Sequence, residues 1–231
     1  MVDTELKLYE EVLLLALKDK EGTFDWHAGN YSYAMAGGIM AELILGGKIR
    51  AEATKKAYIN VMVPDYTGEE ILDVYLERMY QAKRRKKLRD WVATIGNRTG
   101  LKHEVARSLC RKGILQLEEH RVLSLFRTRR YPELIHEPEQ KILDRLKTAI
   151  FTDQPDIDAR TAILISLTNS AGMLGASFPR KELKARKKRI HSIVEGECIG
   201  NATKEAIEAV QAAIVVAAII PALVATTAAT S

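Results

Sequence analysis

The sequence is a succession of helix-length apolar segments separated by short turns. These segments follow one another from about residue 5 to residue 220, and the turn-forming residues are few, with 14 Gly and 6 Pro among 231 residues. A fold made of strands and turns needs more of both, so the pattern favours long helices. We therefore expect a mainly α-helical protein with short β-hairpins, one of them protruding.

The segments belong to a single domain, because the sequence contains no internal repeat and no low-complexity linker between them. A chain of 231 residues can bury a hydrophobic core without disulfide staples. Its content of 47% hydrophobic and 28% charged residues is typical of a soluble globular protein. We expect one domain over residues 1–231, with its core at about 5–220 and a tail at 221–231.

The most membrane-like stretch lies near the C-terminus, at residues 212–225. It has fourteen residues and contains Pro221, whereas a membrane-spanning helix needs about 20 apolar residues. We expect a buried core helix that ends near Pro221. The first residues lack the basic segment of a secretory signal peptide.

The residues typical of catalysis are scattered. No HExxH, GxSxG, GxGxxG or P-loop motif occurs, and neither Cys110 nor Cys198 has the spacing of a metal site or redox pair. Glu10 and Glu11 are adjacent, so on a helix they point to different sides. We expect no enzymatic activity, no metal and no cofactor. The histidines are far apart in the sequence: His27, His103, His120, His136 and His191.

The formal charge of +5 suits an anionic partner, and basic residues gather in three places. The run Lys83–Lys87 is either a solvated helix end or a contact with an anionic surface. A second cluster lies on one predicted helix, within residues 180–189. The third comprises Arg127, Arg129 and Arg130.

This third cluster precedes Tyr131, Leu134 and Ile135 in a predicted irregular loop. Basic residues beside apolar ones suit the boundary between lipid headgroups and acyl chains. The alternative is a loop that folds back on the core. Nucleic acid is a competing anionic partner: the sequence has no recognised nucleic-acid motif, but its short hairpins resemble the wings of a winged-helix fold.

The stretch from Leu8 to Gly22, LYEEVLLLALKDKEG, resembles the opening of the Golgi phosphoprotein 3 (GPP34) family. The resemblance covers roughly residues 5–220. It continues in order through Trp26, Glu42-Leu43, Gly47-Lys48-Ile49, Asp90-Trp91-Val92, Leu109, Lys112 to Leu115, Arg160, Ala162 to Leu167 and Glu197-Cys198.

The resemblance implies a helical, non-catalytic peripheral membrane protein with a protruding β-hairpin and a basic pocket for phosphatidylinositol 4-phosphate. The implied partners are an acidic phospholipid surface and the cytoplasmic tails of membrane proteins, with no nucleic acid, and the hairpin could also join copies of the chain. The implied location is cytoplasmic, on the Golgi face in a eukaryote. Because the sequence starts almost at its first core helix, without the family's long N-terminal arm, it resembles bacterial members.

Residue by residue, the implied lipid pocket is only partly present. The pocket tryptophan corresponds to Trp26, but one pocket arginine falls on Ala36. The other two fall near Thr99 and on Lys102, and Arg98 could substitute at the first of these.

Lysine lacks the planar fork with which arginine grips phosphate. The resemblance therefore implies a weakened pocket, and a protein-interaction scaffold that has lost lipid binding is the alternative. The family hairpin corresponds to about residues 126–136, so Arg127, Arg129 and Arg130 would meet headgroups while Tyr131, Leu134 and Ile135 insert.

Overall fold

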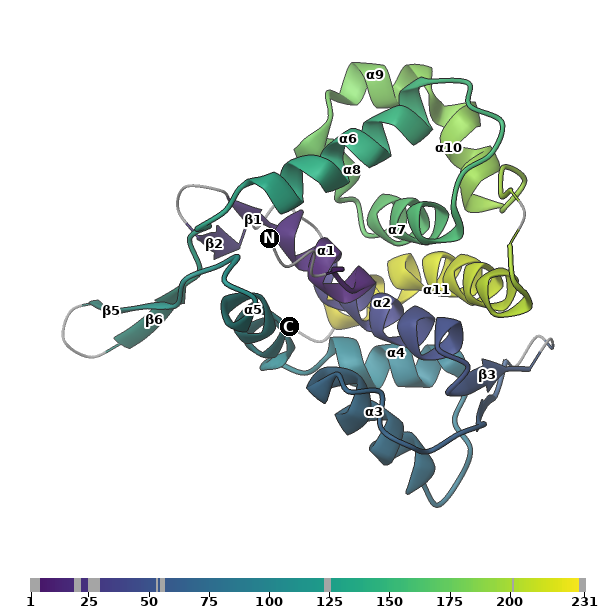
Figure 1. Ribbon diagram of the computed structural model, residues 1–231, viewed down its shortest axis with the longest axis horizontal. Helices are drawn as coiled ribbons and strands as arrows, with labels where there is room; N and C mark the ends of the chain where they lie inside the picture. The colour runs from purple at the N-terminus through teal and green to yellow at the C-terminus, as the bar shows by residue number, and fades with distance from the viewer. Residues whose placement is uncertain are drawn as a thin grey trace.

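The structure, a computed structural model, describes residues 5–18, 22–24, 30–52, 54, 57–122, 126–200 and 202–228. Within these ranges eleven helices and three two-stranded antiparallel sheets account for the regular structure (Figure 1), which confirms the predicted mainly helical fold with short hairpins. The helices are α1 (Leu8–Leu14), α2 (Tyr31–Leu45), α3 (Glu70–Tyr80), α4 (Leu88–Gly96), α5 (Leu101–Arg111), α6 (Glu137–Phe151), α7 (Ala159–Ser170), α8 (Leu174–Ser177), α9 (Arg180–Ala185), α10 (Lys187–Val194) and α11 (Lys204–Ala228).

Helix α2 is the central element of the core. Every residue from Tyr33 to Ile44 is buried, and α2 packs against α1, α4, α7 and α11. In Figure 1, α1, α2 and α11 occupy the middle of the molecule, with α3 and α4 on one side and α6 to α10 on the other. A helix that is apolar on all sides needs such complete surroundings.

Two glycines explain how closely the helices approach α2. A Cβ on Gly38 would lie 2.8 Å from the backbone nitrogen of Tyr9 in α1. A Cβ on Gly37 would lie 2.6 Å from a side-chain carbon of Leu167 in α7 and 2.9 Å from one of Val216 in α11. These two small residues therefore permit close helix contact on both sides of α2.

The adjacent acids of α1 do point to different sides, and each meets its own cation. Glu10 accepts hydrogen bonds from Ser108 Oγ at 2.8 Å and from Lys112 Nζ at 2.6 Å. Glu11 accepts one from Arg145 at 2.9 Å. Both glutamates are buried, and burial raises the pKa of the Glu11 carboxyl although Arg145 opposes that shift. These acids hold α1 to α5 and α6.

A third buried acid, Glu42 of α2, fixes the start of α1. Its Oε1 accepts from the backbone N–H of Leu8 at 2.7 Å and from Arg160 at 2.7 Å. Arg160 also donates to the carbonyl of Leu6 at 3.0 Å. Glu42 and Arg160 are among the residues that carry the family resemblance, and both have a structural role here.

The three hairpins differ in how well the sequence predicted them. The sequence predicts two short strands at residues 48–51 and 56–62, and β3 (Ile49–Ala51) and β4 (Ile59–Val61) lie within them. It does not predict β1 (Leu17–Lys18) and β2 (Thr23–Phe24). For the third, the apolar pairs Ile114-Leu115 and Val122 to Phe126 predict short strands on either side of a polar turn. Val122 and Phe126 do lie in strands, but the polar residues from Glu118 onward form β5 (Glu118–Val122) and no turn, and β5 pairs with β6 (Phe126–Arg130).

The C-terminal helix also differs from the prediction. Helix α11 continues to Ala228 with Pro221 inside it, although we expected it to end near Pro221. Leu223 and Val224 pack against the core beyond the proline and offset the lost helix hydrogen bond. Among the described helices, Glu205–Ala225 is long and apolar enough to cross a membrane, but its inner face packs on α2 and α7 as a core helix does.

Candidate functional site

The hairpin β5–β6 projects from the helical body at the left of Figure 1. Its register pairs Arg130 with Glu118, Arg129 with Glu119 and Thr128 with His120. Successive residues of a strand face opposite sides. The two faces of the hairpin therefore carry different sets of charges.

One face carries Glu119, Arg121, Arg127 and Arg129. The Arg129 guanidinium lies 3.3 Å from the Glu119 carboxylate in an exposed ion pair. Arg127 stands directly opposite Arg121 in the register, although the side chains of these two lie outside the described part of the structure. Like charges placed opposite each other destabilise a strand pair. An anion beside this face would relieve that repulsion.

The far end of the hairpin is apolar. Val122 pairs with Phe126 at the last rung of the ladder. The connecting residues 123–125 are Leu-Ser-Leu and lie outside the described residues. The last described rung of the hairpin thus consists of two apolar residues, and arginines occur along the two strands, which form the shaft.

Tyr131 does not belong to the exposed hairpin, which corrects our expectation that it inserts into a membrane. It is fully buried. Its hydroxyl lies 2.8 Å from Nδ1 of His103, and its backbone N–H donates to the carbonyl of Gly22 at 2.7 Å. Burial raises the pKa of this tyrosine, with Arg129 acting in the opposite direction.

Leu134 and Ile135 are exposed, at 58% and 47%, as the insertion hypothesis requires. However, they lie at the base of the hairpin, where the N–H of Leu134 donates to the carbonyl of Ile114. A five-residue strand spans about 17 Å. The apolar base and the apolar end of the hairpin are therefore well separated.

The structure describes only part of the lipid pocket that the family resemblance implies. Trp26 lies outside the described residues. Ala36 is fully buried in α2. Arg98 forms an ion pair with Glu104 at 2.5 Å, whereas Lys102 lies about 200° around α5 from Glu104. Arg98 and Lys102 thus face different sides, which corrects the idea that they act as one phosphate-binding pair.

Arg98 instead lies with other arginines, in a surface cavity of about 250 Å³ between α3, α5 and the connection that precedes α5. Its guanidinium donates to the buried Tyr75 hydroxyl at 3.0 Å. Among the described residues, no ion pair involves Arg78 or Arg107 of this cavity. In the sequence, the i, i+4 spacing of Arg107 and Arg111 on one helix indicates this group of arginines.

The Lys83–Lys87 run is an irregular connection between α3 and α4. Arg85 pairs with Glu52 at 2.5 Å, and Lys86 Nζ lies 4.8 Å from the centre of the Trp91 ring. The run borders a surface cavity of about 720 Å³. Part of this run therefore has a structural role, and the rest remains exposed to solvent.

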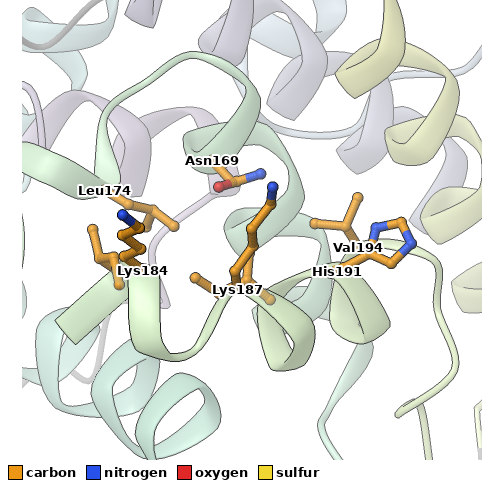
Figure 2. A pocket seen from close by; sticks show the side chains of 8 residues that line it. Asn169, Leu174, Lys184, Lys187, His191 and Val194 are labelled. Carbon is orange, nitrogen blue, oxygen red and sulfur yellow. The ribbon is translucent and has the colours of Figure 1, made fainter. Parts of the chain in front are cut away.

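The second predicted basic cluster is not one continuous helix. It breaks at Arg186, between α9 and α10. Lys184, Lys187 and His191 come from this region to the rim of a cavity of about 350 Å³ with an apolar lining. Figure 2 shows Lys187 and, from α7, Asn169 among the side chains that line this cavity. This cavity lies on a different part of the molecule from the hairpin (Figure 1).

These features define a mainly helical protein built around one central helix, with a charged, apolar-ended hairpin projecting from it. The chain belongs to the Golgi phosphoprotein 3 (GPP34) family, whose sequence pattern matches residues 8–210. It is similar to vacuolar protein sorting-associated protein 74 of Eremothecium gossypii, with 32% identity over 132 residues. That match covers 49% of this chain and 40% of the relative, so the chain spans less than half of the relative's length.

Proposed function

We propose that this protein is a non-catalytic peripheral membrane protein that binds acidic phospholipid headgroups through the hairpin β5–β6. The family is known for peripheral Golgi proteins that bind phosphatidylinositol 4-phosphate, and it is generally non-catalytic. The observation that carries the proposal is the hairpin itself, with arginines along its shaft and apolar residues at its far end. This arrangement suits the boundary between headgroups and acyl chains.

The hairpin does not act by charge alone. Its strands carry four arginines and two glutamates, a net charge of 4 − 2 = +2. Each basic residue near an acidic membrane contributes about 1 kcal/mol, which gives only weak binding. Insertion of Leu123, Leu125 and their neighbours at the hairpin end adds about 0.8 kcal/mol for each buried methylene. Binding therefore needs both contributions.

The choice of lipid follows from the pocket. Ala36 supplies no cation, and Arg98 lies away from Lys102 and is already paired with Glu104. Trp26 and Lys102 remain the proposed headgroup contacts. We expect binding to follow the negative charge of the membrane, with little preference for phosphatidylinositol 4-phosphate over another anionic lipid at equal charge.

Co-sedimentation with liposomes tests the proposal. At low salt the full chain should bind vesicles containing anionic lipid and ignore neutral ones. Replacing Arg127 and Arg129 by alanine should weaken binding about thirtyfold, since two contributions of about 1 kcal/mol are lost. The matched control removes the same charge elsewhere, with Lys181→Ala and Lys188→Ala. An equal loss of binding in both variants would contradict a specific role of the hairpin and indicate a non-specific charge effect.

A second pair of variants locates the inserted apolar residues. Replacing Leu123 and Leu125 by serine at the hairpin end should abolish most binding. The same change at Leu134 and Ile135, at the base, should have a smaller effect. A larger effect at Leu134 and Ile135 would instead identify these two as the inserted residues, as the sequence predicts.

The second candidate is a protein-interaction scaffold of the same fold, which would bind cytoplasmic tails of membrane proteins. The buried Ala36 and the separation of Arg98 from Lys102 favour it. Absence of binding to every anionic vesicle would overturn the lipid proposal and leave the scaffold. Unchanged membrane recruitment of a Trp26→Ala, Lys102→Ala variant in cells would show that any membrane binding does not use the pocket.

A further inference from the structure

Three potential metal ligands meet where the chain leaves the hairpin and enters α6. Glu133 follows β6 and forms an isolated bridge with Leu115, His136 is the residue before α6, and Glu139 lies in the first turn of α6. Together they form the pattern Glu-x-x-His-x-x-Glu. One donor atom from each residue lies within 4.8 Å of the other two.

The two separations between His136 and the carboxylates are close to those of a zinc coordination sphere. His136 Nδ1 lies 2.9 Å from Glu133 Oε2 and 3.6 Å from Glu139 Oε2. Ligands bound to Zn²⁺ at 2.0–2.1 Å in a tetrahedral arrangement lie about 3.3 Å apart. The two separations lie on either side of that value, so a small adjustment would accommodate the ion.

The burial of the carboxylates supplies an independent reason for a cation. The side chains of Glu133 and Glu139 are each only 7% exposed, whereas His136 is 54% exposed. Glu133 Oε1 is buried and has no hydrogen-bond partner among the described residues. A buried carboxylate oxygen without a partner is costly. A protonated histidine would offset one of the two negative charges, but a divalent cation beside a neutral histidine offsets both.

We propose that Glu133, His136 and Glu139 bind one divalent transition-metal ion, for which Zn²⁺ is the best match. An imidazole ligand favours zinc over calcium and magnesium, which prefer oxygen. The three side chains leave a fourth position for water. The ion ties the end of β6 to the start of α6 and so fixes the base of the hairpin. This site departs from our expectation of no metal, and it does not depend on lipid binding.

The test uses the full chain after removal of metal with a chelator, titrated with zinc chloride by calorimetry. One Zn²⁺ should bind per chain and raise the melting temperature. Co²⁺ in its place should give visible absorption bands from a site with mixed nitrogen and oxygen ligands. His136→Gln and Glu139→Gln should each weaken zinc binding at least tenfold, because even indirect supports of a metal site contribute about 10–100-fold.

His191→Gln is the matched control, since His191 is exposed and lies 4.0 Å from Glu195 in a similar histidine–glutamate pair. Its zinc affinity should equal that of the unmodified protein. The proposal is overturned if zinc gives no heat and no shift in melting temperature, if His136→Gln leaves the affinity unchanged, or if Ca²⁺ binds as tightly as Zn²⁺. Circular dichroism shows whether a variant is folded. If one of the two variants above is unfolded, the Co²⁺ spectrum of Glu133→Gln replaces it as the deciding measurement.

Discussion

Among single residues, Glu42 joins two helices, because one carboxylate of α2 holds the first amide of α1 and the guanidinium of Arg160 in α7. Glu42→Ala should lower the free energy of unfolding by about 3 kcal/mol, since it leaves a largely buried cation without its partner. Urea denaturation measures the change. Glu119→Ala, which removes an exposed pair with Arg129, should cost less than about 1 kcal/mol. Similar losses in both variants would contradict the structural role of Glu42.

His103 introduces a dependence on pH. Burial lowers its pKa, and the nearby cations Lys102, Arg129 and Arg107 lower it further. The unfolded chain therefore takes up a proton more readily than the folded protein. The free energy of unfolding should therefore be unaffected by His103 above the ordinary histidine pKa of about 6.5, and it should fall as the pH drops below that value.

Urea denaturation of the unmodified protein and of His103→Gln, between about pH 8 and pH 5.5, measures this contribution. The variant should lose less stability on acidification. Parallel curves would show that His103 does not contribute.

For single residues, the sequence predicted which way a side chain points better than which residue it contacts. The helical period alone indicated that Glu10 and Glu11 diverge, and they do. It could not indicate that Tyr131 is buried against His103, because that contact joins α5 to the residue after β6. Their closeness in the sequence also suggested that Arg98 and Lys102 act together, but Arg98 pairs with Glu104 instead.

At the level of elements, the crossing of α1 and α2 depends on Gly38. Gly38→Ala would place a Cβ 2.8 Å from the backbone nitrogen of Tyr9, so one helix must shift. Overpacking of this kind costs about 1–3 kcal/mol, which thermal unfolding can measure. In Gly100→Ala the new Cβ would meet only the end of the Glu104 side chain, at 3.6 Å, so stability should stay within about 0.5 kcal/mol. A tolerated Gly38→Ala would mean that the helices can separate at little cost.

The longer helices were predictable because each has residues buried against a neighbour, which leaves an apolar pattern in the sequence. The hairpin β5–β6 has no such pattern, since it projects from the body and its residues Glu118 to Arg121 are all polar or charged. Helix α11 was misjudged for another reason. Packing of Leu223 and Val224 on the core outweighs the local signal of Pro221.

For the molecule as a whole, the net charge of +5 predicts that the proposed membrane binding depends on salt. The screening length falls from about 10 Å at 0.1 M salt to about 3 Å at 1 M. Liposome binding should therefore drop steeply with added NaCl and level off at a residual set by the hairpin end. Leu123→Ser with Leu125→Ser should remove that residual and leave the slope. Binding that is insensitive to salt would contradict an electrostatic contribution.

The central place of α11 has a consequence for biosynthesis. Helix α2 is complete once residue 45 has been made, yet it packs against α11, which begins at residue 204. A ribosome adds residues at about 5–20 per second, so the apolar surface of α2 waits roughly ten seconds or more for its last neighbour. During that interval the nascent chain exposes an apolar surface of the kind that chaperones bind. The fold can close only after most of the chain has left the ribosome.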